Sequence, residues 1–364
     1  MVRGRAPHAV LLTGPAGVGK TTLALDLAAG LLCTAAPAER PCRSCRACRL
    51  VERDRHPDIH WLRPEGPGRQ IVIGGKDSKF RGVRDLIVEL AMLPVEGGAR
   101  IAIIENADRM NEDAQGALLK TLEEPPAGAT IMLCADAEEP LAPTIRSRCA
   151  RLRLGPVAVR DIESILSDMG VADAPLAARL ARISGGRPGI AAAWAAAPDA
   201  LLIRDELVRT LVDLVDARPS ERLATIRAAQ ARAMELIASR APVIPEPVQA
   251  DPTIEPDGPE SDEEARVTKV SASDRRRAAE FLVDVWSALG RDLAIASRGV
   301  EGSVRELALL DDTSSLARSV DPATWTAALD SLGTAAVMLK GNVSPELVLD
   351  DLALSWPRRA IAAA

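Results

Sequence analysis

Short apolar runs alternate with helical repeats along the first 155 residues. Apolar residues recur at helical spacing at Leu23, Leu27 and Leu31, and again over Val83–Leu93. A short continuous apolar run is typical of a parallel strand that is buried on both faces. The runs of this kind are Ala9–Thr13, Ile59–Leu62, Arg100–Glu105, Thr130–Cys134 and Ala150–Leu154, with Ile71–Ile73 as a further candidate. The alternation predicts an α/β domain over residues 1–155, with a parallel sheet and flanking helices.

The pattern beyond residue 200 is helical. Apolar residues recur at helical spacing over Leu201–Ser239, Arg275–Ser297, Thr324–Leu339 and Pro345–Leu354. The stretch 241–272 is different, because it is rich in proline and acidic residues and carries no basic residue over 242–264. Such a composition predicts a disordered loop. We therefore expect an all-α domain over 201–364 that this loop interrupts.

Composition narrows the possible functions. The net charge is −6, so a global basic field for non-specific nucleic-acid binding is not expected. Tyrosine is absent and only 2 Phe and 5 Trp occur, which argues against a stacking platform for single-stranded bases. No apolar run approaches the length of a membrane span, and nothing near the N-terminus resembles a signal peptide. We expect a cytoplasmic protein without membrane contact.

The segment after the first predicted strand matches the phosphate-binding loop G-x-x-x-x-G-K-[ST] without a mismatch. Its glycines let backbone N–H groups curl round a phosphate, and the following helix adds the positive end of its dipole. Lys20 would reach the β- and γ-phosphates of ATP, and the Thr21 hydroxyl would hold Mg²⁺. The predicted nucleotide-binding residues are Gly14, Pro15, Ala16, Gly17, Val18, Gly19, Lys20, Thr21 and Thr22. A chance match to a glycine-rich turn is disfavoured because strand, motif and helix occur together.

Glu105 ends a predicted buried strand, which is where a phosphate-loop ATPase keeps the Walker B acid that helps to bind Mg²⁺. A surface carboxylate at a strand end is the alternative. In an active ATPase of this kind a second acid normally follows and activates water. Here the next residue is Asn106, whose amide is not a useful base at neutral pH. The sequence therefore predicts nucleotide binding with weak hydrolysis.

Four of the 6 cysteines lie within residues 33–48. Zinc takes four ligands in a tetrahedron, and a cysteine cluster in a reducing compartment favours metal over disulfide. Nearby arginines would favour the thiolates. The predicted zinc ligands are Cys33, Cys42, Cys45 and Cys48, and such a closed site is structural. A redox pair or four unrelated thiols are alternatives, and His56 or His60 could compete as a ligand, although we favour the all-cysteine site.

Several motifs occur in a fixed order along the chain. They are the phosphate loop, the four-cysteine insert, Leu118–Pro126 (Leu-Leu-Lys-Thr-Leu-Glu-Glu-Pro-Pro), the triplet Ser147-Arg148-Cys149 and Asn342–Leu349 near the C-terminus. Together they resemble the clamp-loader branch of the AAA+ ATPases of bacterial DNA polymerase III. The resemblance implies an AAA+ domain over 1–155, a helical lid over 156–200 and an oligomerising collar over 201–364.

The resemblance also implies roles for residues and partners. Arg148 would act as an arginine finger on the nucleotide of a neighbouring subunit, because a planar, permanently charged guanidinium stabilises charge on the γ-phosphate. An ordinary surface arginine is the alternative. The implied partners are the tau/gamma and delta subunits in a hetero-oligomer, the sliding clamp, and primed DNA through the complex.

The chain departs from the family pattern at several points. Ala135-Asp136 stands where a sensor Thr or Asn is expected, and Gly189 stands at the sensor arginine of the lid, with Arg187 two residues early. The sequence also begins shortly before its first strand, whereas relatives carry a helical segment there that helps to hold the adenine; divergence and a mis-assigned start codon are the two explanations. The departures at Asn106, Ala135-Asp136 and Gly189 all point toward weak hydrolysis.

Three functions follow from these observations. The first is a clamp-loader subunit that binds ATP, hydrolyses it weakly and supplies Arg148 to a motor subunit. The second is an active tau/gamma-like ATPase, in which Glu105 or another acid replaces the missing base. The third, a small-molecule kinase, gives no reason for the cysteine insert, the Ser-Arg-Cys triplet or a collar.

Overall fold

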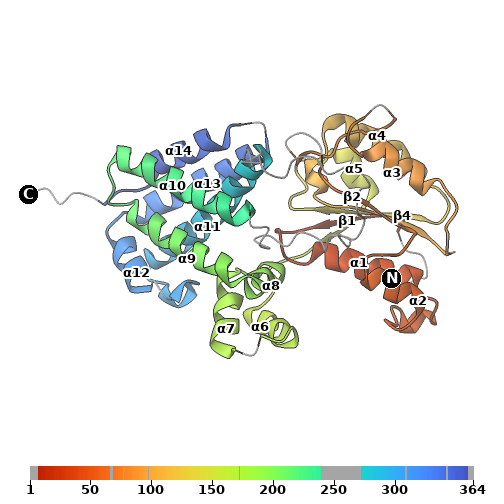
Figure 1. Cartoon of the computed structure of the whole chain (residues 1–364), viewed down its shortest axis with the longest axis horizontal. Coiled ribbons are helices and arrows are strands. Elements are labelled where there is room, and N and C mark those ends of the chain that lie inside the picture. Colours follow the sequence, from red (N-terminus) through yellow and green to blue (C-terminus); the bar gives the residue numbers. More distant parts are fainter. Residues whose placement is uncertain are drawn as a thin grey trace, which may run out of the picture. The chain divides into compact units, whose positions relative to one another are not determined.

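The computed structural model describes residues 7–65, 69–76, 78–96, 98–171, 173–238, 272–307, 310–341 and 343–359. Contacts divide the chain into two compact units, the first ending at Pro156 and the second beginning at Val157 (Figure 1). The predicted disordered loop 241–272 lies outside the described residues except for Ala272. Asn342 of the C-terminal motif also lies outside them.

The first unit is built on a 5-stranded sheet in the order β2-β3-β4-β1-β5. All four neighbouring pairs are parallel, which confirms the predicted parallel sheet. The strands are β1 (Ala9–Thr13), β2 (Ile59–Leu62), β3 (Arg100–Ile104), β4 (Ala129–Ala135) and β5 (Ala150–Arg153).

Helices cover both faces of this sheet (Figure 1). One face carries α1 (Lys20–Leu32) and α2 (Arg46–Glu52), and the other carries α3 (Val83–Leu90), α4 (Glu112–Glu123) and α5 (Pro143–Arg148). The division follows from right-handed crossovers. The chain moves one way across the sheet from β1 to β2 and the opposite way from β2 through β5, so the two sets of connections lie on opposite faces.

Successive side chains of each strand pack alternately against the two helical layers, because the pleat points them to opposite faces of the sheet. Leu11 and Leu133 join the cluster with α3, α4 and α5, whereas Leu12 and Met132 join the cluster with α1 and α2. Both faces of the central strands are therefore buried, which explains why these strands read as continuous apolar runs.

The segment Ile71–Ile73 is not a strand, contrary to the sequence prediction. Ile71 makes only an isolated bridge to Met110. The carbonyls of Val72 and Ile73 accept hydrogen bonds from Val83 and Arg84 at the start of α3. The segment thus fastens the beginning of a helix and does not extend the sheet.

Helix α3 ends earlier than its apolar pattern suggests. The predicted span reached Leu93, but the helix stops at Leu90, and the Leu93 side chain is 88% exposed. Asn111, by contrast, caps α4 as expected for an N-cap residue, because its side chain accepts a hydrogen bond from Ala114 N.

The described residues of the second unit form helices. The helices are α6 (Val159–Asp168), α7 (Ala174–Ile183), α8 (Pro188–Ala196), α9 (Pro198–Asp213), α10 (Pro219–Ala238), α11 (Ala272–Ala296), α12 (Leu310–Arg318), α13 (Pro322–Lys340) and α14 (Pro345–Ser355). The sequence analysis did not predict α12. A helical C-terminal region is confirmed. Its division into a lid (156–200) and a collar (201–364) stays a prediction, and each of these helices contributes residues to one hydrophobic cluster.

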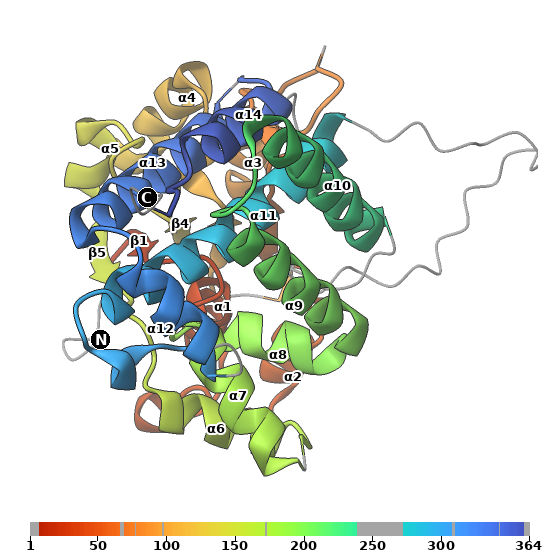
Figure 2. The same ribbon diagram turned by 90° about the vertical axis from the view of Figure 1, so that its left-hand side faces the viewer.

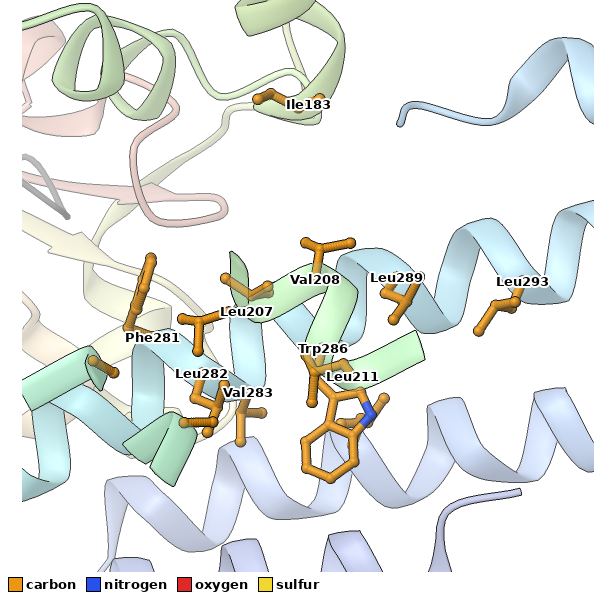
Figure 3. Packing of buried hydrophobic residues seen from close by; sticks show 14 of the residues in the cluster. Ile183, Leu207, Val208, Leu211, Phe281, Leu282, Val283, Trp286, Leu289 and Leu293 are labelled. Carbon is orange, nitrogen blue, oxygen red and sulfur yellow. The ribbon is translucent and has the colours of Figure 1, made fainter. Parts of the chain in front are cut away.

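Helix α11 is the centre of this cluster. It packs against α9, α10, α12 and α13, and Figure 2 shows it running among them. Phe281, Trp286 and Leu293 of α11 are buried, and Leu207 and Leu211 of α9 lie beside Phe281 and Trp286 (Figure 3). The Trp286 ring also meets the Trp356 ring edge-to-face, with 5.0 Å between centroids, which is a favoured aromatic geometry.

Arg222 of α10 is fully buried within the second unit. Its guanidinium donates only to backbone carbonyls, and no ion pair compensates its charge among the contacts of the described residues. The acceptors are Ala217 O, Val215 O, Ala353 O, Trp356 O and Pro357 O, at 2.5 to 3.3 Å. Burial lowers the pKa of this arginine. The side chain thus joins the end of α14 to the α9–α10 connection.

Within the described residues, no helix is both long enough and apolar enough to span a membrane.

Candidate nucleotide and metal sites

Four loops meet at the carboxyl edge of the sheet. Parallel strands all end at the same edge, and the register aligns Thr13 with Ala135 and aligns Ile104 with both Leu62 and Leu133. The residues that follow these strand ends are Gly14, Arg63, Glu105 and Asp136. Ligands of open α/β sheets bind outside this edge. The fold therefore brings the predicted phosphate loop and the predicted Walker B acid to one place.

The phosphate loop has the backbone conformation that its glycines permit. Gly14, Gly17 and Gly19 have φ values of 150°, 79° and 103°, in the region that disfavours side chains. A Cβ at Gly14 would also lie 2.4 Å from Leu154 O. The loop opens directly into α1, whose N-terminus has no side-chain cap. The first N–H groups of α1 are thus available to an anion.

Lys20 is buried at the start of α1 and is held by three acceptors. Its Nζ donates to Gly14 O at 2.6 Å, to Pro15 O at 3.0 Å and to Asp136 Oδ1 at 2.9 Å. The last contact is an ion pair across the edge between β1 and β4.

Glu105 follows β3 and is buried, with a relative exposure of 5%. Its Oε2 accepts from Arg63 Nε at 3.2 Å, while Oε1 makes no hydrogen bond to the described residues. Burial raises the pKa of this carboxyl, and Arg63 and the nearby Thr21 hydroxyl act in the opposite direction. A buried carboxylate oxygen without a partner, beside a hydroxyl at the phosphate loop, fits the oxygen ligands that Mg²⁺ prefers.

Asn106 comes next and has left-handed backbone geometry, with a φ of 47°. Asparagine tolerates this conformation better than most residues. It begins the short helix η3 (Ala107–Arg109). At the position where a second acid was expected, Asn106 thus allows the left-handed turn between β3 and η3.

The four predicted zinc ligands are brought together. The Sγ atoms of Cys33, Cys42, Cys45 and Cys48 all lie within 4.8 Å of one another, so the group could hold a metal ion. Cys33 follows the last residue of α1, and Cys48 lies in the first turn of α2. A tetrahedral zinc with sulfur ligands at about 2.3 Å would need sulfur atoms about 3.8 Å apart. The observed spacing is close to that requirement.

Backbone N–H groups point at the sulfur atoms. Cys42 N, Cys45 N and Cys48 N approach the sulfurs of Cys33, Cys42 and Cys45 at 3.3 to 3.4 Å. Hydrogen bonds, first from Ser44, lower the pKa of Cys42 to about 7, and those from Cys48 and Thr34 lower the pKa of Cys45 to about 5. Burial raises the pKa of Cys48 to about 12. The loop therefore favours thiolates at two of the four positions before any metal binds.

Both histidines near the cluster have other partners. His56 is buried, and its Nδ1 accepts from Asp58 N at 3.2 Å. His60 contacts Arg100 through Nε2 at 2.8 Å and Glu89 through Nδ1 at 3.0 Å. Among the described residues, the metal-binding group contains neither of them.

Arg148 lies at the opposite edge of the sheet from the phosphate loop. It ends α5 and precedes β5, so it stands at the amino edge, whereas Gly14 follows β1 at the carboxyl edge. Strand β1 alone, at about 3.3 Å per residue, separates the two edges by roughly 16 Å. The Arg148 guanidinium contacts Glu123 Oε1 at 2.5 Å and Thr144 O at 2.9 Å. Arg148 is therefore better placed to contact a nucleotide bound to another chain than a nucleotide in the phosphate loop of its own chain.

Arg187, which lies near the position expected for a sensor arginine, has a partner within the second unit. Arg187 precedes α8 and makes two hydrogen bonds to the Asp284 carboxylate of α11, at 2.9 and 3.0 Å. Gly189, the position expected for the sensor arginine, lies in the first turn of α8.

Sequence reasoning did not assign functions to Arg63 or to Asp136. Arg63 directly follows the predicted strand Ile59–Leu62, and Asp136 lies two residues after the end of the predicted strand Thr130–Cys134, which extends to Ala135 in the structure. Their position after the strand ends was a usable signal, since it places polar side chains at the ligand-binding edge.

Known proteins resemble the first unit. Residues 1–158 match the family described as "DNA polymerase III, delta subunit". A DNA polymerase III subunit delta-prime of Pseudomonas aeruginosa is 36% identical over 187 residues, which are 51% of this chain and 55% of that protein. The resemblance to the delta-prime subunit is confirmed. The sequence of the first unit is accordingly similar to that of the delta-prime subunit.

Other subunits are also similar to the first unit. A DNA polymerase III subunit tau of Salmonella typhimurium is 34% identical over 181 residues, which are 49% of this chain and 27% of tau. A gamma subunit-related protein of Thermotoga maritima aligns over 97% of this chain and 94% of its own, with 15% identity and a TM-score of 0.39, too low to show a shared fold. The chain spans about half the length of the delta-prime relative that it matches.

Proposed function

We propose that this chain is a subunit of the DNA polymerase III clamp loader. It would assemble with tau/gamma and delta subunits and help to load the sliding clamp onto primed DNA. The observation that carries the proposal is the placement of Arg148 in its Ser-Arg-Cys triplet, at the sheet edge opposite the phosphate loop of the same chain. A subunit of this kind needs one sheet edge that binds its own nucleotide and another edge that offers an arginine to the nucleotide of the neighbouring subunit.

Reconstitution tests this function directly. The full chain, mixed with purified tau/gamma and delta subunits, should elute with them as one complex in gel filtration. Clamp loading onto primed DNA should require the chain. Failure to enter the complex, with the other subunits competent, would reject the proposal.

The phosphate loop would hold Mg-ATP. Gly14–Thr22 would cradle the phosphates, and Thr21 and Glu105 would provide oxygen ligands for Mg²⁺. The Mg²⁺ would neutralise phosphate charge when bound. Asn106 supplies no base, and the lid offers Gly189 where an arginine is expected, so the chain's own residues are poorly equipped for hydrolysis.

The isolated chain should bind ATP and turn it over very slowly. Lys20→Ala should weaken ATP binding at least tenfold, because the variant loses the side chain that reaches the outer phosphates. Equilibrium titration and a steady-state phosphate-release assay measure the two properties. Robust turnover by the wild type that Lys20→Ala removes would instead establish the tau/gamma-like motor, an alternative that the similarity to tau keeps open.

The four cysteines would hold one zinc ion in a closed structural site. Elemental analysis of the purified chain should find about one zinc per chain. Cys45→Ser should release the metal and lower the thermal unfolding temperature of the first unit, since the ion joins the end of α1 to the start of α2.

Cys134→Ser is the matched control for this zinc prediction. Cys134 is a buried core residue of β4 outside the cluster, so the variant should keep its full zinc content. Wild-type protein that contains no zinc and is equally stable with and without a chelator would contradict the assignment.

A further inference from the structure

Lys20 has no spare hydrogen-bond donor. An ammonium group carries three N–H donors, and Lys20 Nζ has three acceptors, namely Gly14 O, Pro15 O and Asp136 Oδ1. A phosphate oxygen can reach Lys20 only by replacing one of them. Two of the three are neutral carbonyls of the loop itself, and the third is the anionic side chain of the residue that follows β4.

The fold holds Asp136 beside the loop. Thr13 and Ala135 are register partners at the ends of β1 and β4, so Gly14 and Asp136 leave the sheet side by side. Gly14 N donates to Ala135 O at 3.3 Å, and Asp136 N donates to Asp108 Oδ1 at 3.2 Å. The peptide between Ala135 and Asp136 is thus held by hydrogen bonds at both its carbonyl and its N–H group. The Asp136 carboxylate lies beside Lys20 at the phosphate loop.

The phosphates of a nucleotide depend differently on Lys20. Backbone N–H groups of such a loop cradle the α- and β-phosphates, whereas the lysine reaches the β- and γ-phosphates. A diphosphate engages Lys20 through its β-phosphate alone and is also held by the uncapped N–H groups at the start of α1. A triphosphate must draw Lys20 away from Asp136 and also place its own negative charge near that carboxylate.

We propose that Asp136 is a specificity-determining residue that makes the phosphate loop favour a nucleoside diphosphate over the triphosphate. The carboxylate competes with the γ-phosphate for Lys20 and repels it. This inference rests on the proposed nucleotide-binding function of the loop. It gives Asp136 a role that differs from that of a metal ligand, because a metal ligand would strengthen triphosphate binding.

Titrations of the full chain with Mg-ADP and Mg-ATP test the inference. In Asp136→Asn the amide keeps the shape but loses the charge, so ATP affinity should rise about tenfold while ADP affinity changes much less. Asp136→Ser, a second neutral variant, should shift the ratio in the same direction and covers the case in which the asparagine variant misfolds. Glu138→Gln is the charge-matched control, since Glu138 pairs with Arg151 at 3.6 Å, and its ADP-to-ATP ratio should equal that of the wild type.

The outcomes separate the inference from the function on which it rests. Binding of both nucleotides with the same ratio in the wild type and in the folded Asp136 variants overturns the inference and leaves the nucleotide site intact. A loss of ATP affinity in Asp136→Asn also overturns it, because Asp136 then acts as a metal ligand. Absence of any nucleotide binding, in the wild type and in every variant, overturns the nucleotide site and the inference with it.

Discussion

Arg148→Ala should lower the DNA- and clamp-stimulated ATPase of the assembled complex by removing nearly all turnover at the one site that Arg148 serves. Arginine fingers contribute about a thousandfold or more to phosphoryl transfer, because a fixed guanidinium stabilises the charge of the transition state. The complex should still assemble, since the hydrogen bonds and ion pair of the Arg148 side chain are made to surface groups, Thr144 O, Ser147 Oγ and Glu123. Total phosphate release by the reconstituted complex measures the effect.

Arg151→Ala provides the matched control for the arginine finger. Arg151 lies three residues further along, in β5, and its side chain is 60% exposed. The variant removes the same charge from the same region, so its turnover should equal that of the wild-type complex. If Arg148→Ala also assembles and turns over at the wild-type rate, Arg148 does not act on a neighbouring nucleotide.

Arg222→Met should destabilise the helical unit more than any other single arginine replacement in it. The variant leaves five backbone carbonyls in a buried place without their donors. Unpaired buried acceptors cost about 1–3 kcal/mol each before relaxation, so we expect a loss of about 4 kcal/mol in the free energy of unfolding. Urea unfolding followed by tryptophan fluorescence reports on this unit, which contains Trp194, Trp286, Trp325 and Trp356.

Two further variants make the Arg222 measurement specific. Arg222→Lys keeps a charge but has fewer donors and no planar fork, so its loss should be intermediate. Arg227→Met removes an exposed arginine of the same helix that pairs with Asp350 at 3.0 Å, and it should change stability by less than about 1 kcal/mol. Equal losses for Arg222→Met and Arg227→Met would show that the buried hydrogen bonds contribute little.

The strands and motifs of the first unit could be predicted where the pattern that identifies them lies within a few consecutive residues. β1, β3 and β4 are buried on both faces and therefore appear as continuous apolar runs. The phosphate loop and the cysteine insert could be found for the same reason, since their spacing lies within a few residues. Ile71–Ile73 carries a similar apolar signal, but its carbonyls bond to the start of α3, and no local pattern shows which partner a short apolar run will take.

Contacts between distant segments could not be predicted in this way. Arg222 reads as one more arginine of an amphipathic helix, and only the packing of α10 on α14 shows that it is buried. The Lys20–Asp136 pair joins residues 116 positions apart, so it depends on the order of the strands. Helix α12 was missed because its sequence, Leu310–Arg318, carries few apolar residues and begins with two aspartates after its first leucine.

The parallel sheet gives the first unit a polarity with a consequence for assembly. The phosphate loop and Arg148 belong to different edges, so a neighbour that receives Arg148 uses a surface unlike the one that offers it. Such a contact is heterologous, and a two-fold dimer does not readily satisfy both edges through one shared patch. Repetition of this contact generates a ring or an open arc with a direction. Within an open arc, one terminal subunit offers an arginine to no neighbour and the other terminal subunit receives none, so the members of the assembly are chemically unequal even where their folds are alike.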